Sequence, residues 1–432
     1  MPIDGTPEDT ICAIATPTGE GGIGIIRISG PNAATVASKI VRLRTDRTLE
    51  NLPTHTLYLA DFISSSRLTP NRVPEPLLAQ DRFIDEGLVV YMKGPHSFTA
   101  EDVVELHCHG STVVLRRVCE SCVAAGARLA QPGEFTKRAF LNGRLDLSQA
   151  EAVLDTIKAK SECALTVAQR QLRGELSRYV QALRSTLLSL QAQVEAGIDF
   201  SDEDISFITR DDLTTNLQSV ASQIEKMLTS AETGRALRDG VRVVLAGLPN
   251  VGKSSLFNSL IRDDRAIVTN VPGTTRDTIE ESVHWNGLPI TLIDTAGLRE
   301  TADIVEQEGI RRSKDAQAQG DLILHVVDAG DVEHSGSPPF PCPSLRPHDV
   351  IVLNKIDVLP PDTVQTLLDR LHKQVGQRIL PISTKTGEGL ESLKAAITSR
   401  FLVASFESDE TVMITNVRHR VALEQALRSI MQ

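Results

Sequence analysis

A lysine and a serine at the end of a glycine-containing segment have a spacing that points to phosphate chemistry. Residues 247–254, GLPNVGKS, match the pattern GxxxxGK[ST] and lie between a predicted strand over 241–246 and a predicted helix over 255–261. Glycines in such a segment let backbone N–H groups surround phosphate oxygens, close to the positive end of the helix. We therefore expect Lys253 to contact the β- and γ-phosphates and act in catalysis, and Ser254 to bind Mg²⁺.

Four further motifs follow in the order expected of a guanine-nucleotide site. GTTRD at 273–277 holds a threonine that can complete the coordination of Mg²⁺. DTAG at 294–297 can hold the metal through water and offer a backbone N–H to the γ-phosphate. NKID at 354–357 ends in a carboxylate that can accept both N1–H and N2–H of guanine, a pair that adenine lacks, and STK at 383–385 can cover the base. The motifs are expected at the carboxyl ends of parallel strands, where such sheets bind ligands.

We expect the nucleotide to be held by residues of all five motifs, namely Asn250, Val251, Gly252, Lys253, Ser254, Ser255, Thr269, Asn270, Val271, Pro272, Gly273, Thr274, Thr275, Asp294, Thr295, Ala296, Gly297, Asn354, Lys355, Asp357, Ser383, Thr384 and Lys385.

The group that orients the attacking water is less evident. In the Ras pattern a glutamine follows the glycine of DTAG, and here that position is Leu298. The polar residues nearby are Arg299, Glu300, Asp303, Glu306 and Glu308, and no local arginine is an obvious arginine finger. A bound monovalent cation near Asn250 and the loop around Thr274 could supply the positive charge instead.

Composition and charge narrow the class of protein. The chain has 432 residues, with 45 Lys and Arg against 56 Asp and Glu, and its formal net charge is −11. Such a balance argues against a protein that coats nucleic acid by charge alone, and an aromatic content of 3% argues against a base-stacking platform. Six scattered cysteines, no signal-like N-terminus and no apolar run of about 20 residues predict a soluble protein of the reducing cytoplasm.

Three regions with different patterns of apolar residues predict a multidomain fold. Residues 1–143 mix short β-like segments with turns and predict an N-terminal α+β domain. Residues 144–239 carry apolar stripes at helical spacing over 172–194 and 213–231, and residues 403–432 begin another with Val417, Val421, Leu427 and Ile430. Between these helical parts, residues 240–402 alternate apolar strands with helices and predict an inserted Ras-like α/β P-loop G domain. Its expected strands are 241–246, 289–293, 322–327, 350–353 and 379–382.

Two weaker sequence signals are better explained by structural residues than by a binding site. His107 and His109 with Cys119 and Cys122 could supply four metal ligands. However, the histidines have strand spacing and the cysteines lie in a predicted helix over 113–123, so buried structural cysteines are expected instead. Trp285, the single tryptophan, is expected to anchor a strand of the G domain.

Segments outside the G motifs carry a family resemblance over nearly all 432 residues. Residues 15–17 (ATP), 21–30 (GGIGIIRISG) and 132–147 (PGEFTKRAFLNGRLDL) resemble the MnmE (TrmE) family of tRNA-modifying GTPases. The resemblance implies an N-terminal domain that forms a homodimer and binds a formyl-tetrahydrofolate through Arg27, Glu105 and Arg144. Arg144 stands where the family usually has lysine, which keeps the charge and changes the geometry.

The resemblance also implies a mechanism for hydrolysis. Potassium ligands would be Asn250, Thr269, Val271 and Thr274, and Mg²⁺ ligands would be Ser254 and Thr275. Glu306 would orient the water as a catalytic residue, and K⁺ with G-domain dimerisation would replace the arginine finger. With an FAD-containing partner, MnmG, in a heterotetramer, the family adds an aminomethyl-type group at C5 of the wobble uridine of tRNA.

One departure from the family leaves an alternative open. The family ends in a Cys-Ile-Gly-Lys tail, and this sequence ends at Gln432 without it. The leading hypothesis is a K⁺-assisted GTPase that drives tRNA modification with its partner. The alternative is a GTP-regulated binding module that lacks modifying activity because the tail cysteine is missing. A ribosome-assembly GTPase is a weaker hypothesis, because the sequence has no basic RNA-binding appendage.

Overall fold

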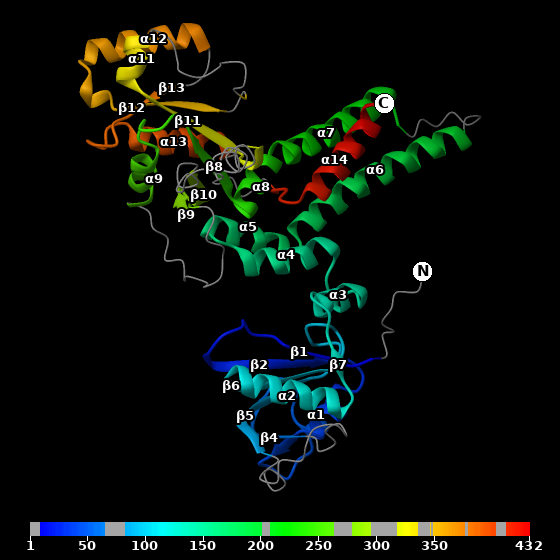
Figure 1. Cartoon of the computed structure of the whole chain (residues 1–432). Helices are drawn as coiled ribbons and strands as arrows, with labels where there is room; N and C mark the ends of the chain where they lie inside the picture. The colour runs from blue at the N-terminus through cyan, green and yellow to red at the C-terminus, as the bar shows by residue number, and fades with distance from the viewer. Residues whose placement is uncertain are drawn as a thin grey trace. The chain divides into compact units, whose positions relative to one another are not determined.

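The computed structural model describes residues 9–64, 83–200, 208–262, 279–294, 318–335, 346, 349–375, 379–402 and 412–432. The chain forms two compact units, Met1–Val153 and Leu154–Gln432 (Figure 1). In these ranges there is no helix with the length and apolar character needed to cross a bilayer.

The first unit is built on a seven-stranded sheet with the order β3-β4-β5-β6-β2-β1-β7. Neighbouring strands are antiparallel except β1 and β7, which are parallel. The strands are β1 (Ile11–Ile14), β2 (Gly21–Ser29), β3 (Val41–Leu43), β4 (Leu57–Ile63), β5 (Phe83–Met92), β6 (Val103–Gly110) and β7 (Arg128–Leu129). The helices are α1 (Ala33–Ser38), α2 (Thr112–Ala125) and α3 (Glu134–Leu141), and a 3-10 turn covers Leu49–Asn51. Helix α4 (Leu147–Lys158) begins in the first unit and ends in the second.

Alternating burial explains why α1 and α2 cover one face of this sheet. On β4, Ala60 and Phe62 are buried in the core, whereas Leu57 and Leu59 are exposed, as a period of two requires. The buried face packs on α2, where Cys119 and Cys122 join the same core. The expectation of buried structural cysteines is therefore confirmed.

The second unit contains a six-stranded sheet with the order β13-β12-β11-β8-β10-β9. The strands are β8 (Val241–Ala246), β9 (Ile279–Trp285), β10 (Leu288–Asp294), β11 (Leu322–Asp328), β12 (Val350–Asn354) and β13 (Ile379–Pro381). All pairings are parallel except that of β9 with β10. The accompanying helices are α9 (Lys253–Arg262), α11 (Ala329–Ser335), α12 (Pro361–Val375) and α13 (Leu390–Phe401), with a 3-10 turn at Ile356–Val358. This is the Ras-like arrangement that the sequence predicted.

The five expected strands are confirmed, and β9 is the strand that the pattern missed. Its sequence, IEESVHW, carries charged residues, because β9 is paired with β10 alone among the described strands and is an edge strand. Trp285 at its end is 3% exposed and lies in the core of the sheet, which confirms its expected role as an anchor.

The helical elements of the second unit are α5 (Glu162–Leu172), α6 (Glu175–Asp199), α7 (Arg210–Thr229), α8 (Ala231–Asp239) and α14 (Val417–Met431). Figure 1 shows α14, in red, alongside α7. Two predictions about these helices were wrong in their bounds, and the stripe predicted on α14 was wrong in part of its residues. The stripe beginning at Leu172 spans a break between α5 and α6, and Ala231 begins α8 instead of ending α7. On α14, Val417 and Val421 are exposed, whereas Leu423, Leu427 and Ile430 pack against the helical core.

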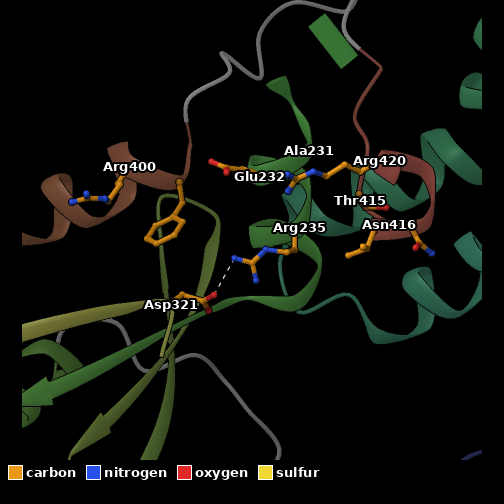
Figure 2. Close-up of a pocket in the computed structure, with 10 residues that line it drawn as sticks. Ala231, Glu232, Arg235, Asp321, Arg400, Thr415, Asn416 and Arg420 are labelled. Atoms are coloured by element: carbon orange, nitrogen blue, oxygen red, sulfur yellow. Dashed lines mark hydrogen bonds and ion pairs between the residues drawn. The ribbon is translucent and has the colours of Figure 1, made fainter. Parts of the chain in front are cut away.

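A pocket of about 300 Å³ lies where α8, α13, α14 and the start of β11 meet (Figure 2). In Figure 2 the guanidinium of Arg235 on α8 points at the carboxylate of Asp321, and the two groups are 2.9 Å apart. Asp321 also accepts a hydrogen bond from the backbone N–H of Arg242 on β8 at 2.9 Å. The carboxylate therefore joins α8 to the sheet.

Residues 412–416 return the chain from the G domain and are held between α5 and α8. Gln171 on α5 donates to the carbonyl of Met413 at 3.0 Å and to Thr415 Oγ1 at 3.1 Å. The backbone N–H of Ile414 donates to Ser230 Oγ at 3.3 Å. Gly234 on α8 lies so close that an added Cβ would be 2.2 Å from the carbonyl oxygen of Ile414. The returning segment is thus packed backbone against backbone.

The close approach at Gly234 predicts that Gly234→Ala destabilises the second unit. The added methyl group must displace backbone, so we expect unfolding to become easier by about 2 kcal/mol, as in overpacked cores. Urea denaturation followed by circular dichroism measures this change. Gly197→Ala on α6 is the matched control, because a Cβ there meets nothing within 4 Å and alanine favours a helix. Equal stability of both variants would contradict the prediction.

Candidate nucleotide site

The segment between β8 and α9 curls tightly around its own backbone. Asn250 and Gly252 have φ of 66° and 96°, and α9 begins at Lys253. Lys253 is 7% exposed, and its Nζ donates to the carbonyl of Leu248 at 2.7 Å, so the ammonium lies within the curl. A positive charge and backbone N–H groups at a helix N-terminus form a suitable cradle for phosphate.

Two predicted metal-binding residues from distant segments meet beside this curl. Ser254 Oγ, on the first turn of α9, donates to Asp294 Oδ2 at 3.0 Å. Asp294 ends β10 and is 2% exposed. A hydroxyl and a carboxylate are hard oxygen donors of the kind that Mg²⁺ prefers, so the donor set fits this ion.

The two predicted base-reading segments lie at the same edge of the sheet. Asn354 is fully buried at the end of β12, where its Nδ2 donates to the carbonyl of Val251 at 2.9 Å. Its Oδ1 accepts from the backbone N–H of Thr384 at 3.2 Å. Asp357 Oδ1 accepts from Ser383 Oγ at 2.7 Å, and Lys385 Nζ lies 3.9 Å from Asp357 Oδ2. The structure therefore brings the loops after β8, β12 and β13 together.

Sequence reasoning missed Asp328 as a supporting residue. Its carboxylate lies 2.6 Å from Lys355 Nζ, which also donates to the carbonyl of Asn250 at 2.8 Å. The available signal was an aspartate directly after the apolar run 322–327, and it is the last residue of β11. Several predicted site residues lie outside the described ranges: Thr269, Asn270, Val271, Pro272, Gly273, Thr274, Thr275, Thr295, Ala296, Gly297 and Glu306.

The three residues that the resemblance assigned to folate also lie together in the first unit. Arg27 on β2 is opposite Glu105 on β6, and their side chains form an ion pair of 2.7 Å. The Arg27 guanidinium lies 5.2 Å from the ring centroid of Phe98, and that of Arg144 lies 5.5 Å from the same ring. Phe135 on α3 is the other aromatic neighbour, with its centroid 5.6 Å from the Arg27 guanidinium. The sequence analysis did not single out either phenylalanine.

A buried ionic cluster fixes α3, which carries Phe135. Arg138 is 7% exposed and pairs with Asp9, Glu101 and Glu134 at 2.5, 3.2 and 3.2 Å. Arg128 donates to both carboxylate oxygens of Glu134, at 2.9 and 2.6 Å. These hydrogen bonds from Arg128 lower the pKa of Glu134 to about 2.

The fold and the site together define a P-loop protein with a guanine-nucleotide-binding G domain set among helices. The MnmE helical domain model matches residues 147–432, and the model for the GTP-binding protein TrmE N-terminus matches residues 10–144. Relatives called tRNA modification GTPase MnmE include one from Symbiobacterium thermophilum, 45% identical over 97% of this chain and 88% of the relative. Others are from Bacillus subtilis, 42% identical over 98% and 89%, and Geobacter metallireducens, 45% identical over 97% and 87%. The chain belongs to the MnmE family.

The lowered pKa predicts how Glu134 contributes to stability across the pH range. In an unfolded chain a glutamate titrates near pH 4.3, so its folded-state carboxylate stabilises the unit above that pH and the gain disappears as pH falls towards 2. Glu134→Gln should cost on the order of 2 kcal/mol at neutral pH, a difference that shrinks steadily below pH 4. Denaturant titrations from pH 7 to pH 3 measure it, with Glu20→Gln as the exposed control. A cost independent of pH would contradict the assignment.

Proposed function

We propose that this protein hydrolyses GTP with the help of K⁺ and, with the FAD-dependent partner MnmG, drives C5 aminomethyl-type modification of the wobble uridine in tRNA. The observation that carries the GTPase part is the convergence of Ser254, Asp294, Asn354 and Asp357 at one edge of the sheet. Membership of the MnmE family supports tRNA as the substrate. A tRNA substrate in turn points to the cytoplasm.

Each part of the nucleotide has a group suited to it. Lys253 and the N–H groups from Asn250 to Ser255 would receive the phosphates, and Ser254 and Thr275 would hold Mg²⁺, with Asp294 supporting the ion through water. When bound, Mg²⁺ neutralises charge on the β- and γ-phosphates. Asp357 accepts the N1–H and N2–H of guanine, while Thr384 and Lys385 cover the base. Ser383 and Asn354 hold these loops in place through the bonds described above.

The missing glutamine after DTAG leaves the attacking water to Glu306 in this proposal. Asn250, Thr269, Val271 and Thr274 would hold K⁺, whose charge stabilises the transferring phosphoryl group where an arginine finger otherwise acts. Asn250 has positive φ and is exposed next to the phosphate cradle, which suits a side-chain oxygen ligand for such an ion.

Glu306→Ala should abolish most K⁺-stimulated hydrolysis and leave GTP affinity nearly unchanged. Loss of a group that orients water or accepts its proton typically costs about 10²–10⁴-fold in rate. Steady-state phosphate release in KCl and in NaCl of equal ionic strength measures the effect, with Glu308→Ala as the neighbouring control. Equal rates in the two salts for the unaltered protein would overturn the role of K⁺.

Asp357→Asn should change which base the site accepts. The carboxylate accepts two N–H groups of guanine, whereas an asparagine presents one acceptor and one donor and matches the oxygen at C2 of xanthine. A buried donor left without its partner typically costs 10⁴-fold or more in discrimination, so we expect GTP affinity to fall by at least about 10²-fold and XTP binding to appear. Fluorescent-nucleotide titration measures both. Unchanged GTP preference would show that Asp357 does not read the base.

The first unit supports two further parts of the proposal. Arg27 and Arg144 lie against the ring of Phe98, and Glu105 pairs with Arg27. This combination of charged groups and a flat ring fits a formyl-tetrahydrofolate, whose ring can stack and whose carboxylates can pair with arginine. The face of the sheet opposite α1 and α2 exposes Leu57, Leu59 and Leu88, and we infer that a second copy covers it in the homodimer.

The decisive test is modification of tRNA in a mixture of this protein, MnmG, GTP and a one-carbon folate, with and without KCl. Appearance of the modified wobble nucleoside by mass spectrometry would support the whole proposal. Because the chain has a net charge of −11, we expect the partner to provide much of the binding surface for tRNA. GTP hydrolysis without any modified nucleoside would favour the alternative, a GTP-regulated binding module.

A further inference from the structure

The hairpin formed by β9 and β10 connects the nucleotide site to helix α5. Its open end carries Asp294, whose carboxylate accepts from Ser254. Its closed end is the turn at Asn286 and Gly287, both with positive φ (50° and 79°). The seven residues of β9 and the seven of β10 pair one to one without a bulge, from Leu288 opposite Trp285 to Asp294 opposite Ile279.

The turn fits against α5 with no space to spare. A Cβ added at Gly287 would lie 2.6 Å from Cys163 Sγ and 3.6 Å from Cys163 Cβ. The first distance is a clash and the second an ordinary contact, so a single sulfur atom sets the approach of the turn. Asn286 Nδ2 lies 3.5 Å from Thr398 Oγ1 on α13, which gives the turn a second neighbour.

The strand next to the turn is held by the same helix. Trp285 is buried in a core that includes Val167 of α5, and Cys163 packs against that core. Burial and the nearby charge of Lys160, two residues before α5, lower the pKa of His284 on β9. The end of β9 and α5 therefore contribute side chains to the same core, in addition to the approach at Cys163.

The pairing of β9 makes the hairpin able to transmit a displacement. Whereas β10 is fixed by β8 on its other side, β9 is the edge strand and depends on β10 alone within the described part of the sheet. Slipping of β9 by one residue along β10 would turn every side chain of β9 to the opposite face of the sheet, so the register is fixed. A tilt at one end of β9 is therefore expected to displace its other end. A shift at the tip is therefore expected to reach the open end of the hairpin, where Asp294 pairs with Ile279.

We propose that Gly287 and Cys163 are positioning residues of the nucleotide site: their contact sets the hairpin, and through it the geometry around Asp294. Because coupling between sites is reciprocal, occupation of the nucleotide site is also felt at α5. The proposal rests on the proposed GTPase activity, and it adds a helix outside the G domain to the machinery of hydrolysis.

A double-mutant cycle isolates this contact. Gly287→Ala creates the clash with Sγ, and Cys163→Ala removes the sulfur while leaving Cβ at a normal distance. The strain of a positive φ at position 287 is the same with either residue at 163, so it cancels in the cycle. Gly126→Ala is a control, since Gly126 also has positive φ (120°), lies outside the nucleotide site and a Cβ there meets nothing within 4 Å.

The proposal expects a specific split between binding and turnover. Gly287→Ala should lower kcat about tenfold with GTP affinity kept within about threefold, because the cradle and the base site lie on β8, β12 and β13. Adding Cys163→Ala should restore kcat to within about threefold of that of Cys163→Ala alone. A purely structural defect would instead lower the melting temperature and the active fraction without rescue. Failure of rescue in folded protein, or an unchanged kcat in Gly287→Ala, would overturn the proposal.

A measurement on the unaltered protein decides the matter even if Gly287→Ala does not fold. Trp285 is the single tryptophan of the chain, so its emission reports this strand alone. We expect its emission to change, and the alkylation rate of Cys163 to change at least about threefold, on binding a non-hydrolysable GTP analogue with Mg²⁺ instead of GDP. Peptide mass mapping assigns the alkylated cysteine. Both readouts unchanged at saturating nucleotide would overturn the coupling, whereas failure to bind nucleotide at all would refute the proposed GTPase function instead.

Discussion

The buried side-chain amide of Asn354 is the constraint on which the nucleotide site depends. Its donor is used by the carbonyl of Val251 and its acceptor by the N–H of Thr384, so the ends of β8, β12 and β13 meet at one side chain. A buried amide with one of these bonds missing would cost about 1–3 kcal/mol. The amide also occupies the space beside Gly252, where an added Cβ would lie 2.3 Å from Asn354 Nδ2. The loops after β8, β12 and β13 are thus set relative to each other by the protein alone, an order that lowers the entropy cost of binding any ligand they hold.

The G domain shows what local sequence can predict. Strands β8, β11 and β12 are almost wholly buried, so their mostly apolar sequences could be recognised, and the motifs that follow predicted strands indicated the edge of the sheet at which the site lies. Strand β9 was missed because an edge strand needs no such run. The position of Asp328 after an apolar run was a signal, but its pairing with Lys355 could not be predicted, since it joins the ends of the neighbouring strands β11 and β12 through the tertiary structure.

The buried face of α14 and the residue group around Arg27 in the first unit show the same limit of prediction from local sequence. On α14 the spacing predicted a helix correctly, yet the apolar face includes Leu423 and excludes Val417, because the neighbouring core chooses among possible stripes. In the first unit the sequence motif indicated Arg27 and Arg144, but not the ring of Phe98 between them. Phe135 reaches this group because a cluster of buried charges around Arg138 fixes α3. Such clusters give geometry more than stability, since burying the charges offsets much of their attraction.

The packing of residues 412–416 on α8 has a consequence for the architecture of the chain. The polypeptide enters the G domain from the end of α8 at Asp239 and returns against the same helix at Ile414, whose carbonyl touches Gly234. The two connections of the G domain are therefore neighbours, as in domains that have been inserted into an existing scaffold. A helical scaffold with adjacent attachment points can accept, lose or exchange a whole domain while its own helices keep their partners. The G domain is in this sense a module seated on the helices, and the helices remain one continuous structure in space although the sequence divides them.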